Sequence, residues 1–596
     1  MILENINGEV KPRHILALMG ASGSGKTSLL SLLGGRTPPN IEIKGKIMIN
    51  RELPYTSKIR KRIGFVLQDD LFYDTLTVKE TLFYAALLRL PEDMSKQEKK
   101  TRINVLMETL GIAKSKDTII GGFMRRGISG GERKRVSVAH ELIINPSILF
   151  LDEPTSGLDS SSAYNLMILL KDIASSGRAV MTTIHQPSSR LYNQLDQVML
   201  LHEGKVAYHG NALEAESWFA SHGLPLPHGT NLADHIIDCV TLSPVHKVHD
   251  IIQVCYNMHA QKYMHVQEND AINVHIGEES TESPPRTLVT QKYVKRIKCF
   301  MRDVFGPSEK SWWTRALHTF IMTHKLMRVK RFESFSLDQW FLVFAISVIT
   351  GLLWFQKGKQ NDLMSSLDMI GLIFFLILFP SFRALFSALF CYPGDYRILV
   401  KEKPSNMYSM SIYYWARSLS DLPLDISMPS LLVIIVYWLG YLKATASAFF
   451  ATWTSILLVL FVAQAWGLWI GGLTMEPRKA QTVSTIIILT FLLVGGFYVK
   501  NVPVWIGWIK YFSFIYWGNN LITKIQFSDA RIEACDGRTS CSVIPQDELQ
   551  DRLNILADPN ARQWPEVVIL IAMFIGLRTF AYFTLEWQTF SSFQSL

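Results

Sequence analysis

Long runs almost free of charged residues fill the sequence after about residue 337. Each run is close to the length that an α-helix needs to cross a bilayer. Inside lipid a backbone must satisfy its own hydrogen bonds, so these runs are restricted to helices. Hydrophobic residues make up 48% of the chain against 19% charged, and the excess belongs mainly to this half. We expect an all-α domain over residues 337–596 with six transmembrane spans, at residues 340–355, 369–390, 422–442, 448–473, 482–499 and 565–585.

Basic residues in the short loops indicate how the spans are oriented, because cytoplasmic loops are enriched in lysine and arginine. They are Arg397, Lys401, Lys403 and Arg417 in the second-to-third connection, and Arg478 and Lys479 in the fourth-to-fifth. Both connections, and with six spans both termini, should be cytoplasmic. The net charge of +9 is therefore explained by a bilayer surface, and we expect no nucleic-acid partner.

The segment at about residues 500–564 should then face outward. There "CDGRTSC" places Cys535 and Cys541 close enough in sequence for a small disulfide in an oxidising space. Two free thiols are the alternative.

The first 240 residues have a different pattern, in which short apolar strands such as "HILALMG" and "SILFLDE" alternate with helical stretches. This alternation predicts an α/β domain with a largely parallel sheet. Residues 241–310 include the polar, proline-containing "HIGEESTESPPRT" and indicate a flexible linker. Residues 311–336 interleave aromatic and basic residues, as in an amphipathic connecting helix at the membrane surface. The start, "MILENINGEVKPRH", has no apolar core of secretory type, so this half should be cytosolic.

A glycine-rich stretch, "GASGSGKT", follows the apolar "HILALM" and precedes the helix-like "SLLSLLGG". It fits the pattern G-x-x-x-x-G-K-[ST], whose backbone N–H groups wrap a polyphosphate at the positive end of a helix. In such a loop Lys26 neutralises the outer phosphates and the Thr27 hydroxyl binds Mg²⁺. The residues expected to bind the phosphates are Gly20, Ala21, Ser22, Gly23, Ser24, Gly25, Lys26 and Thr27.

Acidic and polar residues follow three other expected strands. "ILFLDE" ends in Asp152, which can hold the Mg²⁺ shell, and Glu153, which can polarise an attacking water. Gln68 follows "RIGFVL" and His185 follows "AVMTTI", so they can contact the metal water and the terminal phosphate. We expect Glu153, His185 and Gln68 to be catalytic, and Thr27, Gln68 and Asp152 to hold the metal.

A second stretch suited to an anion, "ISGGERKR", lies well downstream of the first. Ser129, Gly130 and Gly131 open a helix of alternating basic and apolar residues, and such a helix start can bind phosphate. A chain with one complete phosphate loop has no evident need for a second. The alternative is a solvated basic helix start.

Together these motifs resemble those of an ABC transporter ATPase. "GASGSGKT" is similar to Walker A, Gln68 in "FVLQDD" to the Q-loop, "ISGGERKR" to the signature, "LFLDEPTSGLD" to Walker B with the D-loop, and "TTIHQPSS" to the H-loop. An ATPase region before six spans, with "KRFESFS" before the first, resembles the G subfamily of White/brown complex half-transporters. "LTVKETL" and "HELIINPS" resemble plant members, and the resemblance covers nearly the whole chain.

The resemblance implies two ATPase domains that meet head to tail. Each ATP, with Mg²⁺, would lie between the Lys26 loop of one chain and Ser129, Gly130 and Gly131 of the other, with Asp159 at the same seam. The second anion-binding stretch, "ISGGERKR", then belongs to the ATP site of the partner chain. Because every motif is intact in one chain, a homodimer would have two competent sites, and a heterodimer with another half-transporter is also compatible.

The resemblance further implies ATP hydrolysis coupled to export of a lipophilic or amphipathic small molecule, such as a lipid, hormone or secondary metabolite, across the plasma membrane. In the family the substrate enters between the second and fifth spans of two subunits. Phe382 falls where the family has a cavity aromatic and Phe497 near its hydrophobic plug, although packing or lipid-facing positions are equally open. Arg383, a charge inside a span, either faces the cavity and favours an anionic or amphipathic substrate or pairs with an acid such as Asp421 or Asp425. An ATP-gated regulator or channel without pumping is the alternative function.

Two features depart from the family pattern. Ala21 stands where proline is common, which backbone phosphate contacts should tolerate. No segment with an aromatic residue for the adenine precedes "ILENINGEV", so either adenine is held differently or the natural N-terminus is longer.

Overall fold

The chain divides into two compact units in this computed structural model. The first contains Met1–Ile321, Val400–Ser409 and Ser591–Leu596, and the second Met322–Leu399 and Met410–Phe590. The structure describes residues 2–36, 41–45, 47–49, 53–54, 62–122, 125–262, 272–276, 312–331, 337–360, 362–405, 407–499, 502–528, 533–535, 541–543 and 562–591.

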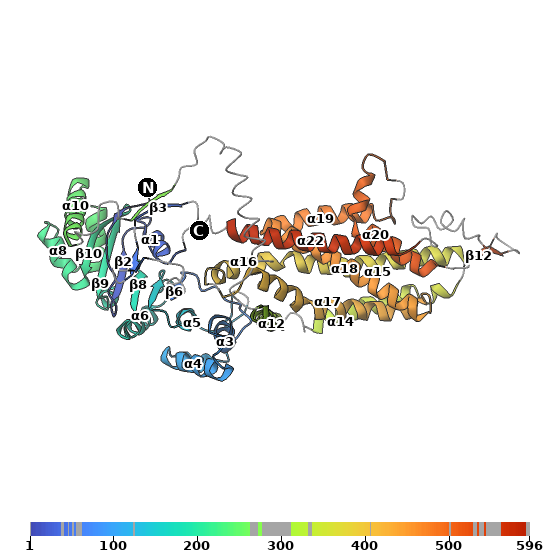
Figure 1. The fold of residues 1–596 in the computed structure, drawn as a ribbon, viewed down its shortest axis with the longest axis horizontal. Coiled ribbons are helices and arrows are strands. Elements are labelled where there is room, and N and C mark those ends of the chain that lie inside the picture. Colours follow the sequence, from blue (N-terminus) through green and yellow to red (C-terminus); the bar gives the residue numbers. More distant parts are fainter. Residues whose placement is uncertain are drawn as a thin grey trace. The chain divides into compact units, whose positions relative to one another are not determined.

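A six-stranded sheet forms the centre of the first unit, in the order β10-β9-β2-β8-β7-β6 (Figure 1). Four neighbours, β2, β8, β7 and β6, run parallel, β9 is parallel to β2, and only β10 is antiparallel. The strands are β2 Ile15–Met19, β6 Ile63–Val66, β7 Ile148–Leu151, β8 Ala179–Thr183, β9 Gln197–His202 and β10 Lys205–Asn211. β2 and β6 are buried at every residue, as expected for continuous apolar strands covered on both faces.

Helices flank this sheet, and three of them begin with a reciprocal capping box, at Thr77 with Glu80, Ser95 with Glu98, and Ser129 with Glu132. The helices are α1 Lys26–Leu33, α3 Val78–Arg89, α4 Lys96–Thr109, α5 Gly130–Leu142, α6 Ser160–Ser175, α7 Ser189–Tyr192, α8 Ala215–Ser221, α9 Leu232–Thr241 and α10 Val245–Lys262. Two small antiparallel sheets join β1 Leu3–Ile6, β11 Ile272–Ile276 and β3 Ile41–Lys44, and β4 Met48–Ile49 with β5 Leu53–Pro54. The α/β prediction with a largely parallel sheet is confirmed.

The region predicted as a linker contains a helix. Helix α10, Val245–Lys262, lies inside residues 241–310 and packs against β10, and β11 lies there as well. The proline-containing stretch after β11 lies outside the described residues. The predicted connecting helix corresponds to α12, Trp312–Val329, whose Trp312, Trp313 and Phe320 are exposed.

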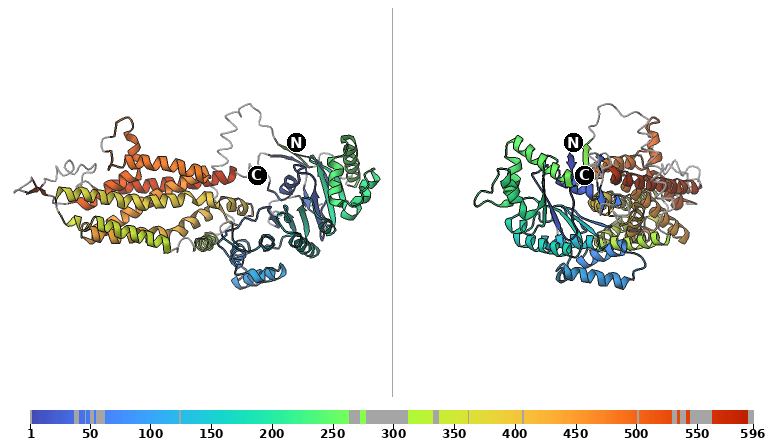
Figure 2. Two further views of the ribbon diagram at one scale, coloured as in Figure 1. Left: turned by 180° about the vertical axis from the view of Figure 1, so that it is seen from behind. Right: turned by 60° about the vertical axis from the view of Figure 1, so that its left-hand side comes forward.

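The second unit is helical, and Figure 2 shows its helices alongside one another from behind. Among the described residues, five helices are long and apolar enough to cross a membrane, and they coincide with the first four and the last predicted spans. The helix at the fifth, α19, has only 17 residues and ends at Leu493, just before Gly495 and Gly496. The count of six therefore remains a prediction. The helices are α14 Leu337–Leu353, α15 Leu363–Leu389, α16 Cys391–Glu402, α17 Met410–Gly440, α18 Ala446–Thr474, α19 Pro477–Leu493, α20 Phe514–Phe527 and α22 Trp564–Ser591.

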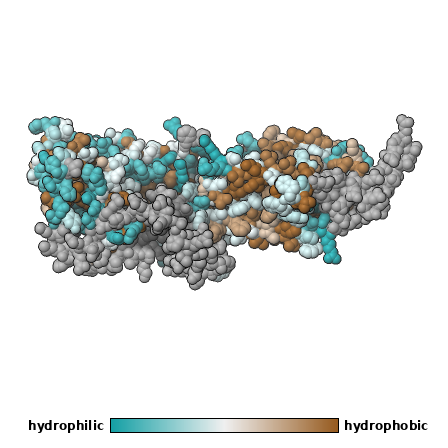
Figure 3. All heavy atoms as spheres, turned by 90° about the horizontal axis from the view of Figure 1, so that it is seen from above, coloured by the Kyte–Doolittle hydropathy of each residue, from teal (hydrophilic) through white to brown (hydrophobic). Residues whose placement is uncertain are grey.

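Close packing of α15 on α18 holds the centre of this unit. A Cβ atom at Gly467 would lie 2.3 Å from the carbonyl oxygen of Leu385, and one at Gly471 would lie 2.4 Å from that of Leu389. These two glycines, four residues apart, let the helix backbones touch as small residues do between membrane helices. The outward-facing side chains are largely hydrophobic in the view of Figure 3, as a lipid-facing surface requires.

The segment expected to face outward contains a helix that the sequence did not reveal. Helix α20, Phe514–Phe527, is mostly buried and packs against α18 and α15. Beyond it, β12 Glu533–Cys535 pairs with β13 Cys541–Val543 so that Cys535 stands opposite Cys541. This register suits the predicted disulfide, which remains a prediction because the cysteine side chains lie outside the described part of the structure.

Candidate functional site

The predicted site residues gather at one edge of the six-stranded sheet. The glycine loop follows β2, Gln68 follows β6, Asp152 and Glu153 follow β7, and His185 follows β8. Since these four strands are parallel neighbours, their carboxyl ends meet at the same edge, which is where ligands bind in open α/β sheets.

The loop between β2 and α1 has the backbone that a phosphate cradle needs. Gly20, Gly23 and Gly25 have φ angles of 143°, 80° and 97°, which strongly favour glycine. A Cβ at Gly20 would lie 2.2 Å from the carbonyl oxygen of Leu201, whereas one at Gly23 would meet no atom within 4 Å. The loop thus packs on the sheet at one end and is open at Gly23.

The Lys26 ammonium lies inside this loop. It donates hydrogen bonds of 2.9 Å and 2.8 Å to the carbonyl oxygens of Gly20 and Ala21. Burial lowers the pKa of Lys26, while Glu153 and Asp152 act to raise it. The buried Ser24 hydroxyl has no hydrogen-bond partner among the described residues. A cation and a free donor in an open glycine loop fit a polyphosphate.

Asp152 connects the loop to the neighbouring strands. Its Oδ1 accepts a hydrogen bond of 3.2 Å from the Thr27 hydroxyl and one of 2.7 Å from the Thr183 hydroxyl. Within the described residues there is no cluster of three or more acidic, histidine or cysteine side chains suited to a metal. Mg²⁺ needs none, because it is usually held by one or two protein oxygens together with phosphates and water. The Thr27–Asp152 pair fits that donor set.

Glu153 and Gln68 also meet at this edge. Gln68 Nε2 donates a hydrogen bond of 2.7 Å to Glu153 Oε2, and the Glu153 backbone is held at a positive φ of 43°. Such strained non-glycine residues cluster at functional sites. A carboxylate held here can orient and polarise a water molecule.

His185 lies beside this cluster and differs from its other members. Its ring is exposed and forms no hydrogen bond or ion pair within the described part of the chain. The neighbouring Gln186 has a positive φ of 43°. His185 is therefore free to contact a ligand at the sheet edge.

The second glycine-rich stretch forms the start of α5. Ser129 caps this helix: its backbone N–H and its hydroxyl each donate to Glu132 Oε2, and its hydroxyl accepts from the Glu132 N–H. Hydrogen bonds from Ser115 and Ser129 lower the pKa of Glu132. Ser129 and Gly130 are exposed. The start of this helix thus lies at the surface of a single chain.

Asp159 lies close to the same helix start. It caps α6 by accepting a hydrogen bond of 3.0 Å from the Ser162 N–H, and its bonds to Ser162 lower its pKa. A Cβ at Gly131 would lie 3.2 Å from the Ser162 hydroxyl, so α5 and α6 begin side by side.

The two anion-suited stretches are not joined within one chain. Across the described residues, no hydrogen bond or ion pair links Ser129, Gly130 or Gly131 to residues 20–27. The expected nucleotide contacts thus divide into two groups, of which one includes the sheet edge and the other the α5 start.

Two residues that sequence reasoning missed hold these groups in place. Thr183, fully buried at the end of β8, bonds Asp152 and also accepts a 2.7 Å hydrogen bond from the Glu153 N–H. Lys134 of α5, 3% exposed, donates to the Gln68 carbonyl oxygen at 2.8 Å and lies 3.1 Å from Asp70. The sequence signal that could have identified Lys134 is a charged residue in the middle of a predicted helix.

Part of the second-to-third connection belongs to the first unit. Lys401, within Val400–Ser409, donates a hydrogen bond of 2.9 Å to the Leu71 carbonyl oxygen. Its ammonium also lies 3.6 Å from the ring centre of Phe72. This segment thus contacts the loop that begins at Gln68.

Comparisons with known proteins agree with this arrangement. Residues 3–156 match the family model "ABC transporter", and residues 318–527 and 185–305 match two models described as "ABC-2 type transporter". ABC transporter G family member 22 of Arabidopsis thaliana is 37% identical, covering 98% of this chain and 76% of that protein. Member 14 is also 37% identical, covering 98% and 87%, and Protein white of Drosophila melanogaster is 28% identical, covering 98% and 83%.

Proposed function

This chain belongs to the G family of ABC transporters, an integral membrane protein that binds nucleotide and couples ATP hydrolysis to transport, and we propose that it is a dimeric half-transporter that exports a lipophilic or amphipathic small molecule. The observation that carries the dimer is the exposed start of α5, which forms no hydrogen bond or ion pair with residues 20–27 in the part of the chain that the structure describes. A second copy, or another half-transporter, supplies it to that loop.

In this proposal the sheet edge performs the chemistry. Backbone N–H groups of residues 20–27 and the Lys26 ammonium hold the phosphates of ATP, and Thr27, Asp152 and Gln68 hold Mg²⁺. When bound, Mg²⁺ neutralises charge on the phosphate oxygens. Glu153 orients and deprotonates the attacking water.

The partner chain completes the site. Its Ser129, Gly130 and Gly131 donate to the terminal phosphate from the start of α5, with Asp159 at the same seam. His185, whose ring has no hydrogen-bond or ion-pair partner among the described residues, contacts that phosphate as well. Closure of two ATPase domains on ATP then acts on the membrane helices, and hydrolysis resets them.

We place the protein in the plasma membrane with both termini in the cytoplasm. Basic residues in the short connections support this orientation, and an oxidising exterior would permit the Cys535–Cys541 disulfide. Export is the direction we propose for the cargo.

ATP-driven accumulation of a probe in inside-out vesicles tests this function. We expect the wild type to concentrate the fluorescent alcohol 1-pyrenebutanol against its gradient, and Glu153→Gln to lose this accumulation. Passive flux that equalises concentrations and survives in Glu153→Gln would instead identify a gated channel.

A further inference from the structure

Arg383 is a charged residue in the membrane helix α15. Among the described residues it forms no hydrogen bond and no ion pair, and its side chain is half-buried. A charge at membrane depth is costly unless it is paired or faces water, so an intramembrane arginine indicates a function or a partner.

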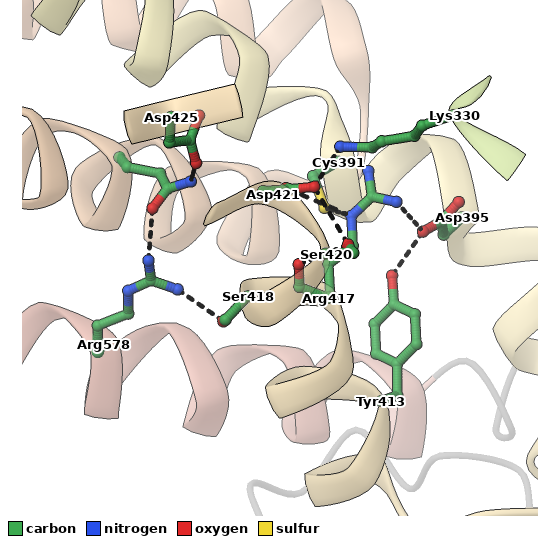
Figure 4. Close-up of polar contacts among 11 residues, drawn as sticks. Lys330, Cys391, Asp395, Tyr413, Arg417, Ser418, Ser420, Asp421, Asp425 and Arg578 are labelled. Carbon is green, nitrogen blue, oxygen red and sulfur yellow. Dashed lines mark hydrogen bonds and ion pairs between the residues drawn. The ribbon is translucent and has the colours of Figure 1, made fainter. Parts of the chain in front are cut away.

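The two acids that could have neutralised Arg383 form hydrogen bonds or ion pairs with other residues (Figure 4). Asp421 forms an ion pair with Lys330 and lies 3.8 Å from Arg417. Asp425 accepts a hydrogen bond of 2.5 Å from the amide of Gln464. The charge of Asp425 acts on Arg383, but within the described residues the two side chains form no ion pair. Of the two alternatives open from the sequence, an ion pair of Arg383 with Asp421 or Asp425 is not found among the described residues.

The Gln464 amide is itself held on its other side. Its Oε1 accepts a hydrogen bond from Arg578 Nη2, and Arg578 Nη1 donates to Ser418 at 2.8 Å. Asp425 is therefore held by a chain of contacts that leads away to Arg578.

Arg383 lies on an aromatic face of α15. Five phenylalanines recur at intervals of three or four residues, so they follow one side of the helix. They are Phe375, Phe379, Phe382, Phe386 and Phe390. The first four are half-buried and Phe390 is 41% exposed, whereas Leu376, Leu385 and Leu389 on the other side are fully buried. Phe375 and Phe379 stack with ring centres 5.8 Å apart.

We propose that Arg383, on this aromatic face of α15, selects those transported molecules that carry a carboxylate on a flat, lipophilic body. The phenylalanine rings supply contact area for that body, and the planar guanidinium matches a carboxylate with two parallel hydrogen bonds. This inference rests on the proposed export of lipophilic molecules and adds a preference for monoanions within that class.

Three probes with one body and different charges test the selection. They are 1-pyrenebutyrate, 1-pyrenebutanol and 1-pyrenebutylamine, added to the purified full chain in nanodiscs of neutral lipid without ATP. We expect the wild type to bind the carboxylate at least about tenfold more tightly than the alcohol, the scale of one charged hydrogen-bonded contact. Equal affinities for the three probes in the wild type would overturn the proposal.

Variants assign this preference to Arg383. Arg383→Gln should bind carboxylate and alcohol equally, and Arg383→Lys should retain most of the preference. Arg478→Gln, the same substitution at an exposed arginine at the start of α19, should leave the preference intact. If Arg383→Gln does not fold, Arg383→Lys still tests the selection. Equal binding of carboxylate and alcohol by Arg383→Lys would contradict a selection based on charge.

Changing the lipid of the nanodisc distinguishes binding of a transported molecule from binding of a lipid headgroup. If phosphatidylglycerol in the nanodisc removes carboxylate binding to the wild type, Arg383 holds a lipid phosphate and the substrate role fails. Uptake into vesicles tests the transporter itself: accumulation of all three probes without charge preference would refute only the selection. Charge-selective binding without ATP-driven accumulation of any probe would refute only the export.

Discussion

Thr183 Oγ1 donates a hydrogen bond of 2.7 Å to Asp152 Oδ1, and through this bond β8 holds the acid at the end of β7. The same hydroxyl accepts the N–H of Glu153 at 2.7 Å. One buried side chain thus holds both acids of the proposed hydrolytic site.

Thr183→Val should lower kcat for ATP hydrolysis by at least about fivefold, because losing a hydrogen bond to a charged group costs about 1.5–3 kcal/mol. The valine keeps the shape of the side chain and removes only the hydroxyl. Thr182→Val is the matched control: Thr182 is also fully buried, but its hydroxyl bonds to the backbone oxygen of Thr183. Equal losses in steady-state ATPase assays of the two variants would contradict this role of Thr183.

Lys26→Met and Glu153→Gln should each stop ATP hydrolysis, but at different steps. Lys26→Met removes the cation from the glycine loop and should weaken ATP binding. Glu153→Gln leaves that loop intact and should retain ATP in a closed dimer. Retention of labelled ATP after gel filtration separates the two, and normal turnover in either variant would disprove the assignment.

Co-expression of two inactive chains tests the shared site. A mixed dimer of Lys26→Met with Ser129→Arg keeps one intact pair of glycine loop and α5 start, so it should recover one of two sites. The control places both substitutions on one chain and pairs it with the wild type, which leaves no intact pair in the mixed dimer. Equal activity of the two affinity-purified mixed dimers would contradict a site shared between chains.

Lys401→Met should uncouple transport from hydrolysis. The methionine loses both the hydrogen bond to the Leu71 carbonyl oxygen and the contact with the Phe72 ring, next to the loop of Gln68. We expect vesicle uptake to fall more than ATP hydrolysis when both are measured in the same proteoliposomes. Lys401→Arg keeps the charge and should retain uptake; a parallel fall of both activities in Lys401→Met would indicate a role in hydrolysis itself.

His140 should make the first unit less stable as pH falls below about 6.5, its ordinary pKa. Burial lowers the pKa of His140 although its hydrogen bond to Glu141 opposes this. Between the ordinary and the lowered pKa, the unfolded chain therefore binds a proton that the folded chain does not bind. The free energy of unfolding consequently decreases as the pH falls, until the pH reaches the lowered pKa. Thermal unfolding of the full chain followed against pH should show this loss, and His140→Gln should lessen it.

Glu141 acts in a lower pH range. Burial would raise its pKa, but Arg89, 3.0 Å away, and His140 together hold it well below its ordinary value. Its contribution to stability is therefore present above about 4.5 and is lost only as pH falls through the lowered pKa. An unchanged slope in His140→Gln above that range would assign the pH dependence to another group.

Local patterns in the sequence were sufficient to predict the family and the fold class. A glycine loop between an apolar strand and a helix depends on neighbours within a few residues, as Gly20 and Lys26 illustrate. Apolar runs such as 369–390 and 448–473 have to be helical wherever they pack, because lipid leaves the backbone no other partner. Both predictions are confirmed.

Other features depend on residues far apart in the sequence. The sequence placed helix α20 in an outward-facing segment, because the helices that bury it, α18 and α15, are distant in sequence. Helix α19 ends before its apolar run does, because Gly495 and Gly496 follow.

The sequence by itself thus determined which side chains end the strands and which runs are apolar, since both follow from local order along the chain. Only the tertiary structure decided that Thr183 holds Asp152 and Glu153, that Lys134 holds the Gln68 backbone, and that Arg383 forms no ion pair with an acid of the described residues. The physical reason is that a polar side chain acquires its role from the partner within hydrogen-bond reach, and folding selects that partner among residues distant in sequence.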